Sequence, residues 1–270
     1  MFIPFTDRLG LGPNLTPQII LDFINAKGSV LIALSSTQPT PAGLVSLLLE
    51  LDIHLPSDRN SLVVDHFNYD TLSAPEKHDV ILIPKPGALR ADVKNFFKGG
   101  GKDDEYIAFP KGVGHVLGND SPLLTPVLRA PRTAYCYNSK DEDGVEEPFA
   151  TGQQLGLVSV MQARNSARFT IIGAAEMLED KWFDANVKRS VGMPGGGLGP
   201  KEVKTTNRAF AKQISGWTFN EIGVLKAGKI EHYFSDVGSK YNGTNPNIYR
   251  VKNKVVSVLK PCWWPLLTEL

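Results

Sequence analysis

The strongest constraint on the fold is a short apolar run between two helical patterns. Ser29–Leu34 (SVLIAL) is continuously apolar after its first residue, which is typical of a strand buried on both faces of a sheet. Thr16-Pro17 before it and Thr40-Pro41 after it each place a hydroxyl at a helix N-cap and a proline at the first helical position. Apolar residues recur at helical spacing behind both pairs. We therefore expect a helix that stops at Gly28, a buried strand and a second helix.

More strands follow the second helix. Three short apolar segments are the candidates: Leu62–Val64, Val80–Ile83 and Tyr106–Phe109. Strands that alternate with helices predict an α/β fold, a mainly parallel sheet with helices on its faces. We expect residues 17–110 to form that sheet, with helices at Pro17–Ala26 and Pro41–Asp52 packed on it.

The middle of the chain is less regular. Residues 110–153 are rich in glycine, proline and charge, which predicts irregular structure. Leu157–Met161 and Arg168–Ile172 indicate two apolar strands about a polar turn, in which Asn165 is able to take a left-handed backbone conformation. A short helix is expected over Glu179–Val187.

The last third begins with a glycine-rich segment. Residues 192–200 (GMPGGGLGP) cannot hold regular structure, which predicts a linker or loop. A helix capped by Thr205 or Thr206 is expected to follow and to close at Gly223. Residues 224–234 then have the character of a strand.

Charge and cysteine content exclude several classes of function. The formal charge is +1, from 29 basic and 28 acidic residues, which gives no electrostatic reason to expect nucleic acid or an anionic membrane surface as a partner. No run approaches the ~20 apolar residues that a membrane span needs. The two cysteines, Cys136 and Cys262, are too few for a zinc site built from cysteine pairs. A single disulfide is one alternative, and two separate thiols are the one that we expect.

Motifs for catalysis and cofactor binding are missing from the sequence. Gly195–Lys201 (GGGLGPK) lacks the hydroxyl residue of a phosphate-binding loop and carries a proline where an N–H is needed. Gly10-Leu11-Gly12 does not continue into a dinucleotide fingerprint, and no serine stands in a G-x-S-x-G motif. The five histidines show no H-x-x-H or H-x-H spacing. We therefore expect no catalytic residues, no cofactor and no metal.

One polar cluster has functional interest. Residues 65–70 (DHFNYD) directly follow the strand candidate Leu62–Val64, and ligand sites in open α/β sheets gather at the carboxyl ends of strands. A turn in which Asp and Asn bond their own backbone explains the same residues, and we prefer it to a ligand site. The candidate ligand-binding residues are Asp65, His66, Asn68 and Tyr69.

Two segments are similar in sequence and order to a known family. Residues 63–70 (VVDHFNYD) resemble the hydrophobic strand, Asp-His and Asn-Tyr-Asp of the DDOST family. Residues 157–167 (LVSVMQARNSA) and 173–183 resemble that family's Gln-Ala-Arg-Asn segment and the helix after it. The resemblance runs from about Leu11 to Tyr249.

The resemblance implies an accessory, non-catalytic subunit of the oligosaccharyltransferase complex, which transfers a dolichol-linked oligosaccharide to asparagine of nascent proteins. Other subunits, including the membrane-embedded catalytic one, are the implied partners, and no cofactor is implied. The implied location is the lumenal side of the endoplasmic reticulum membrane, with a C-terminal anchor that we expect to be absent from this chain. Gln162, Arg164 and Asn165 are then expected to serve structure or a subunit contact. The alternative is a stand-alone α/β module that binds a saccharide or another small ligand near residues 65–70.

The resemblance also implies a domain plan. A Rossmann-like GIFT domain is expected over 1–190, a glycine-rich loop or linker over 191–201, a helix and strand that complete the α/β domain over 202–235, and the start of a truncated β-rich region with an atypical tail over 236–270. No signal peptide is recognisable at the start. Residues 2–5 correspond to the family's second strand, so the first strand–helix unit is expected to be missing and the sheet to be less stable without it.

Three N-x-[ST] sequons are candidate glycosylation sites. They lie at Asn14, Asn119 and Asn242, all in predicted loops, as acceptor sites must. Asn119 ranks last, because Pro122 follows its Ser121.

Overall fold

The computed structural model describes residues 2–3, 16–38, 40–58, 61–85, 105–118, 121–137, 148–190, 202–223, 226–234 and 254–262. They belong to two compact units, unit 1 (Met1–Glu221) and unit 2 (Ile222–Leu270). The asparagines of the three sequons and the glycine-rich segment 191–201 lie outside the described residues.

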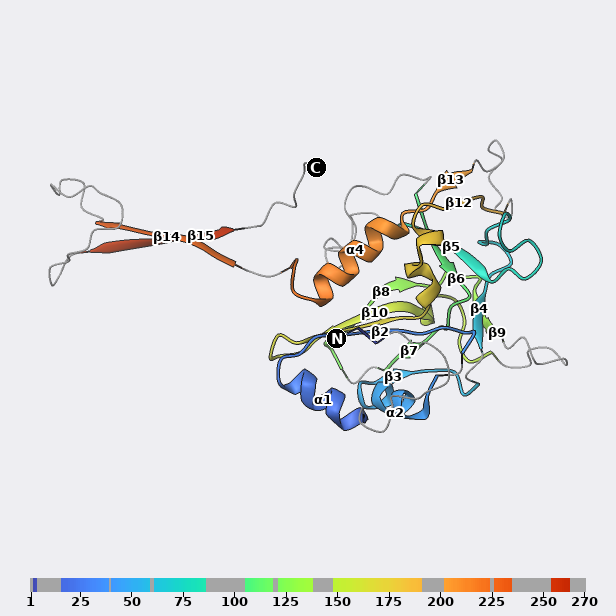
Figure 1. The fold of residues 1–270 in the computed structure, drawn as a ribbon, viewed down its shortest axis with the longest axis horizontal. Helices are drawn as coiled ribbons and strands as arrows, with labels where there is room; N and C mark the ends of the chain where they lie inside the picture. Colours follow the sequence, from blue (N-terminus) through green and yellow to red (C-terminus); the bar gives the residue numbers. More distant parts are fainter. Residues whose placement is uncertain are drawn as a thin grey trace. The chain divides into compact units, whose positions relative to one another are not determined.

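Unit 1 contains a five-stranded sheet of mixed direction (Figure 1). Its strands lie in the order β1 (Phe2–Ile3), β2 (Val30–Ala33), β11 (Arg168–Ile172), β10 (Gly156–Gln162) and β8 (Leu124–Arg129). β1 and β11 both run parallel to β2, whereas β10 runs antiparallel to β11 and to β8. The α/β class is confirmed, and the mainly parallel sheet is wrong.

The antiparallel part of the sheet follows from a tight connection. β10 and β11 are joined by the turn 163–167, in which the N–H of Ala163 donates to the carbonyl of Ala167 over 2.9 Å. Such a short connection allows only an antiparallel pair, because a parallel pair needs a crossover of a dozen or more residues. β2 and β11 are separated by more than 130 residues of chain, which leaves room for that crossover.

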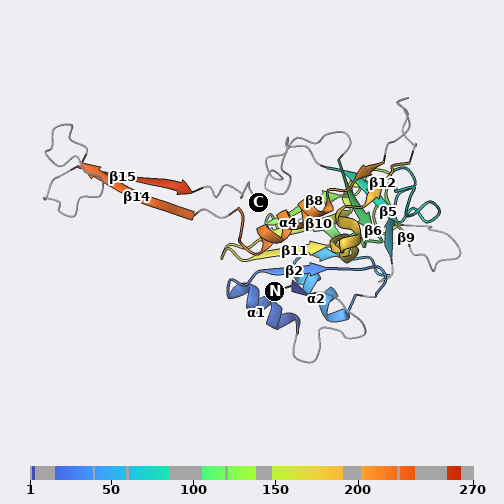
Figure 2. The ribbon, with the colours of Figure 1, turned by 45° about the horizontal axis from the view of Figure 1, so that its top comes forward.

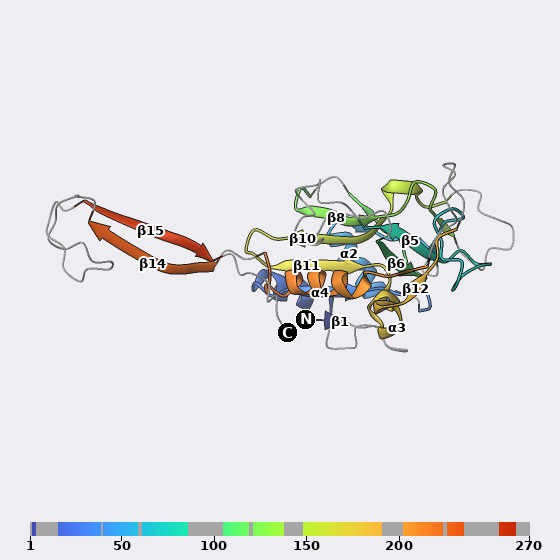
Figure 3. The same cartoon turned by 90° about the horizontal axis from the view of Figure 1, so that it is seen from above.

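Helices cover both faces of the sheet. α1 (Pro17–Asn25) and α2 (Ala42–Glu50) lie on one face, and α4 (Asn207–Thr218) lies on the other (Figures 1 and 2). Alternate side chains of β11 supply the two layers. Phe169 and Ile171 pack in the core with α1 and α2, whereas the Thr170 hydroxyl lies 2.6 Å from that of Thr218 on α4, which runs along β11 (Figure 3). The two predicted helices on this sheet are thus confirmed.

α1 begins where the sequence predicted but ends before the predicted glycine. α1 opens as predicted, with the N–H of Ile19 donating to the Thr16 hydroxyl over 3.4 Å. It ends before Gly28, because Lys27 takes the left-handed conformation (φ 69°) and the N–H of Gly28 donates to the carbonyl of Phe23 over 2.8 Å. Gly28 is needed for space, since a Cβ there would lie 2.3 Å from the Phe23 ring.

α4 likewise ends before the predicted glycine. It begins after Thr206, as expected, although the Thr206 hydroxyl donates to the carbonyl of Tyr106 instead of capping the helix. It closes at Thr218 instead of Gly223, because Asn220 adopts the left-handed conformation (φ 61°) that lets Glu221 bond back to Gly216 over 2.8 Å.

Three predicted strands pair outside the five-stranded sheet. β4 (Leu62–Val64) pairs with β9 (Tyr135–Tyr137), and β5 (Val80–Pro84) pairs with β6 (Tyr106–Pro110), both antiparallel. A third small antiparallel pair joins β3 (Ile53–His54) to β7 (Val116–Leu117).

The segment 110–153 is therefore more regular than its composition predicted, since it supplies β7, β8 and β9. β8 carries Pro126, which a strand at the edge of a sheet tolerates. In β9 the Cys136 thiol is free and buried, and burial raises its pKa to about 12. Cys136 therefore serves as a small buried side chain of the core.

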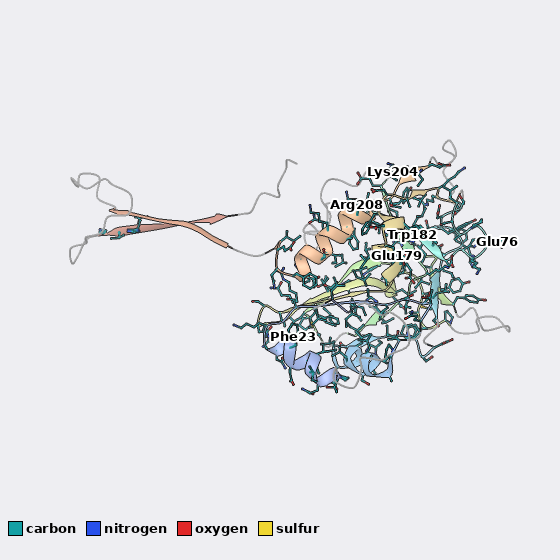
Figure 4. The ribbon with its side chains drawn as sticks, viewed as in Figure 1. Phe23, Glu76, Glu179, Trp182, Lys204 and Arg208 are labelled. Carbon is teal, nitrogen blue, oxygen red and sulfur yellow. The ribbon has the colours of Figure 1, made fainter. Side chains whose placement is uncertain are left out.

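A second core lies beside α4. It forms from β5, β6 and three short elements after β11: α3 (Asp180–Phe183), β12 (Asn186–Val187) and β13 (Val203–Lys204). η2 (Ala175–Leu178) contacts β6 next to it. The predicted helix over Glu179–Val187 is thus shorter, because Asn186 and Val187 pair with β13. α3 packs next to the start of α4, where Arg208 bonds Asp184 over 2.6 Å close to Trp182 (Figure 4).

Unit 2 contains an antiparallel pair of longer strands. β14 (Lys226–Phe234) pairs with β15 (Val255–Cys262). β14 is the strand that the domain plan placed in the α/β domain; in the structure its partner is β15 in unit 2.

Candidate functional site

Asp65 organises the loop that follows β4. Its side chain is fully buried and accepts hydrogen bonds from the N–H groups of Phe67 and Asn68, at 2.8 and 3.1 Å, and from the Asn68 amide at 3.0 Å. The Thr133 hydroxyl, next to β9, donates to the same carboxylate over 2.8 Å. These bonds form a turn in which Asp65 holds its own backbone and joins β4 to the segment before β9.

The rest of the loop is fastened to residues 188–190. Arg189 donates to the side-chain oxygen of Asn68, and the N–H of Lys188 donates to Asp70 over 2.8 Å. Asp70 is buried and also accepts from the N–H of Ser73 over 3.1 Å. Both carboxylates are therefore engaged by protein donors, which leaves them little capacity for a ligand.

His66 and Tyr69 belong to an aromatic cluster at the surface of this loop. His66 is exposed, and its Nε2 lies 2.9 Å from the hydroxyl of Tyr135 in β9. Tyr69 stacks on His78 with ring centroids 3.8 Å apart, and the His66 ring meets His78 edge-on at 4.8 Å. The sequence singled out His66 and Tyr69 but not His78 and Tyr135, which are brought together only by the pairing of β4 with β9 and by the turn before β5.

The three candidate residues at the turn between β10 and β11 differ in their surroundings, because Asn165 is bonded within the fold whereas Gln162 and Arg164 are exposed. The Asn165 amide donates to the carbonyls of Ile24 and Asn25 at the end of α1, over 2.8 and 3.1 Å, and its oxygen accepts from the N–H of Ala167 over 3.0 Å. Gln162 and Arg164 are exposed. The left-handed residue of this turn is Ser166 (φ 72°) and not Asn165, whose side chain bonds to α1.

Asn165→Ala is expected to lower the free energy of unfolding by about 1–2 kcal/mol, because two carbonyls at the end of α1 and one N–H of the turn lose their partner. Urea unfolding measures the change. Arg164→Ala, at the exposed neighbour, is the matched control and should stay within about 0.5 kcal/mol of the parent chain. Equal effects of the two substitutions would show that Asn165 does not hold α1.

A further polar group lies where β2 and β11 end. The Ser35 hydroxyl after β2 donates to the carboxylate of Glu176 in η2, and the Ser36 hydroxyl donates to the carbonyl of Lys111 over 2.5 Å. Burial raises the pKa of Glu176, and the nearby Glu179 raises it further. Ligand sites in α/β sheets gather at this edge of parallel strands, and no sequence motif marked it.

A hollow of about 660 Å³ lies at the β8 edge of the sheet. Its lining includes Leu117, Pro126, Arg129 and Gln154, and none of the loop 65–70. Among the described residues no three His, Cys, Asp or Glu side chains converge as metal ligands, and no helix there has the length and apolar character needed to cross a bilayer.

Comparison with known proteins shows which family this chain resembles. Residues 2–221 match the family model described as OST48, N-terminal domain. The chain belongs to the OST48 N-terminal domain family. The matched range ends at the residue where unit 1 ends, so the OST48 N-terminal domain match covers unit 1 and not unit 2.

Curated relatives of the OST48 family match most of the chain. The dolichyl-diphosphooligosaccharide–protein glycosyltransferase subunit wbp1 of Schizosaccharomyces pombe is 30% identical over 91% of this chain and 50% of its own length. The 48 kDa subunits of the same-named transferase from Danio rerio and Arabidopsis thaliana are 32% and 30% identical, over 90% and 94% of this chain and 51% and 53% of theirs. The chain thus spans about half the length of the curated relatives it matches.

A solved structure of similar outline is the mmIFT52 N-terminal domain. It shares 15% identity with this chain, at a TM-score of 0.48, over 78% of this chain and 72% of that one. Likeness at this level is too low to carry conclusions about function.

Proposed function

We propose that this chain acts as part of an accessory, non-catalytic subunit of the oligosaccharyltransferase complex and supports transfer of the dolichol-linked oligosaccharide to asparagine. The match of residues 2–221 to the OST48 N-terminal domain carries the proposal. The names of the relatives, all subunits of the dolichyl-diphosphooligosaccharide–protein glycosyltransferase, support it. Its partners are the other subunits, including the catalytic one, on the lumenal side of the endoplasmic reticulum membrane.

We further propose that unit 1 is a Rossmann-like GIFT domain. The parallel set β1, β2 and β11, with α1 and α2 on one face and α4 on the other, supports this description. The domain plan of 1–190, 191–201, 202–235 and 236–270 stays a prediction.

Within unit 1 we assign the subunit contact to the turn between β10 and β11. Gln162 and Arg164 are exposed there on a rigid support, because Asn165 fixes the turn to α1. The side-chain polar groups of Asn165, Asp65 and Asn68 already form hydrogen bonds within unit 1. These three residues therefore have structural roles in this proposal.

Capture of the complex tests the assignment. Arg164→Glu in the full-length protein is expected to reduce recovery of the catalytic subunit with a tagged copy, because it inverts an exposed charge, and to leave stability within about 0.5 kcal/mol. Lys204→Glu, an exposed charge reversal in β13, is the matched control and should capture the complex normally. If Arg164→Ala abolished oligosaccharide transfer in a complex that assembles normally, the turn would belong to the catalytic machinery and the assignment would be wrong.

A stand-alone ligand-binding module is the second candidate function. The polar edge at Ser35 and Glu176 favours it, because hydroxyl and carboxyl groups lie together where α/β sheets take ligands. The loop at Asp65 favours it less, since its carboxylate is already satisfied. Saturable binding of a glycan by the chain alone, lost in Glu176→Gln, would support this candidate.

A further inference from the structure

Two histidines that are twelve residues apart in sequence face each other at the surface of unit 1. His66 follows β4, and His78 precedes β5. Their Nδ1 atoms are 2.5 Å apart. Two ring nitrogens at this distance cannot both carry a proton, so at least one presents a lone pair to the other.

The rest of the cluster holds the two rings in this orientation. His66 Nε2 lies 2.9 Å from the Tyr135 hydroxyl, and an Nε2–H that donates to this hydroxyl leaves the lone pair of the ring on Nδ1. His78 is half-buried and stacked on Tyr69 at 3.8 Å. Histidines that bind metals have the same design, in which one ring nitrogen is the ligand and a hydrogen bond from the other orients the ring.

We propose that His66 and His78 bind a divalent transition-metal ion of the zinc, nickel or copper class through their Nδ1 atoms. Imidazole is a preferred ligand of these ions. Zinc–nitrogen bonds of about 2.0–2.1 Å in tetrahedral geometry require the two nitrogens to be about 3.3 Å apart. The rings therefore separate by less than about 1 Å on binding, which small side-chain rotations provide because His66 is exposed.

The site supplies two protein ligands. No third His, Cys, Asp or Glu side chain joins the pair within the described ranges, so water fills the other positions. Asp65 and Asp70 stay outside it, because their oxygens are held by protein donors. With the His66 lone pair on Nδ1, the proton between the two rings is on His78 Nδ1, so metal binding requires the neutral His78 ring to carry its proton on Nε2 instead.

Titration calorimetry with zinc ion alone, on the whole chain near neutral pH, tests the proposal. Binding is expected in the parent chain and should be lost in His66→Gln and in His78→Asn; asparagine is chosen because His78 has a φ of 51°, which asparagine tolerates. Tyr135→Phe removes the orienting hydroxyl and should weaken binding about tenfold. His54→Gln, at another exposed histidine of unit 1, is the matched control and should bind as the parent chain does.

Thermal melts without zinc identify any variant that does not fold. If His78→Asn does not fold, His66→Gln still tests the proposal, because His66 is exposed. A parent chain that binds no more zinc than His66→Gln overturns the proposal. So does a His54→Gln variant that loses binding to the same extent as His66→Gln.

Discussion

Lowering the pH from 7 to 4 is expected to remove about 3 kcal/mol from the free energy of unfolding through one side chain, His115. This histidine is fully buried and directly precedes β7 in the chain. Burial lowers its pKa from 6.5 to about 3. Its Nε2 lies 2.6 Å from the Ser159 hydroxyl of β10, and its Nδ1 has no hydrogen-bond partner within the described part of the chain. Nothing there compensates a positive charge.

The sign follows from the proton count. Between pH 6.5 and about 3 the unfolded chain carries a proton on His115 and the folded chain does not, so acidification favours unfolding. The contribution is fully present above pH 6.5 and is lost progressively as the pH falls toward 3. Each pH unit in that window costs about 1.4 kcal/mol.

Urea unfolding at pH 7, 6, 5 and 4 measures the effect against a chain that cannot titrate at this position. The double variant His115→Met with Ser159→Ala replaces both partners by apolar groups, which avoids leaving the Ser159 hydroxyl buried without a partner. The difference in stability between parent and double variant should change by about 3 kcal/mol over this range. A difference that does not change with pH would show that His115 takes up its proton over the same pH range in the folded and the unfolded chain, and the prediction would be wrong.

Local patterns predicted the elements of unit 1 better than their pairing. The apolar run at Val30–Ala33 and the Thr-Pro pairs are local signals, because each depends on only a few neighbouring residues. β2, α1 and α2 form where these signals predicted them. The partner of Leu62–Val64 is Tyr135–Tyr137, in a segment whose glycine and proline content predicted no strand. Pairing depends on contacts across many residues, and neither hydrophobic period nor turn signal encodes them.

The same distinction applies to the candidate site. The Asp65 turn was predictable, because Asp and Asn bonds to a neighbouring backbone are local. The roles of Asn165 and His78 were not, since one side chain reaches the end of α1 and the other meets His66 only after the turn before β5 closes. Spacing rules for histidines detect ligands on one helix or strand, and these two are on neither.

Asp65→Ala is expected to destabilise unit 1 by about 3 kcal/mol, which would assign the hydrogen bonds of this carboxylate to structure. The substitution leaves the N–H of Asn68, the Asn68 amide and the Thr133 hydroxyl without their acceptor. It also releases the tie between β4 and the segment before β9. Asp22→Ala, at an exposed aspartate on α1, is the matched control and should change stability by no more than about 0.5 kcal/mol.

A coupling measurement separates this structural role from ligand binding. If the Asp65–Thr133 bond stabilises the fold, Thr133→Val should cost much less in the Asp65→Ala background than in the parent chain, because the partner it loses is already gone. A carboxylate kept for a ligand behaves differently, since its removal leaves stability unchanged or improved. An Asp65→Ala chain that melts at or above the parent temperature, with additive effects of the two substitutions, would therefore return Asp65 to the list of ligand-binding candidates.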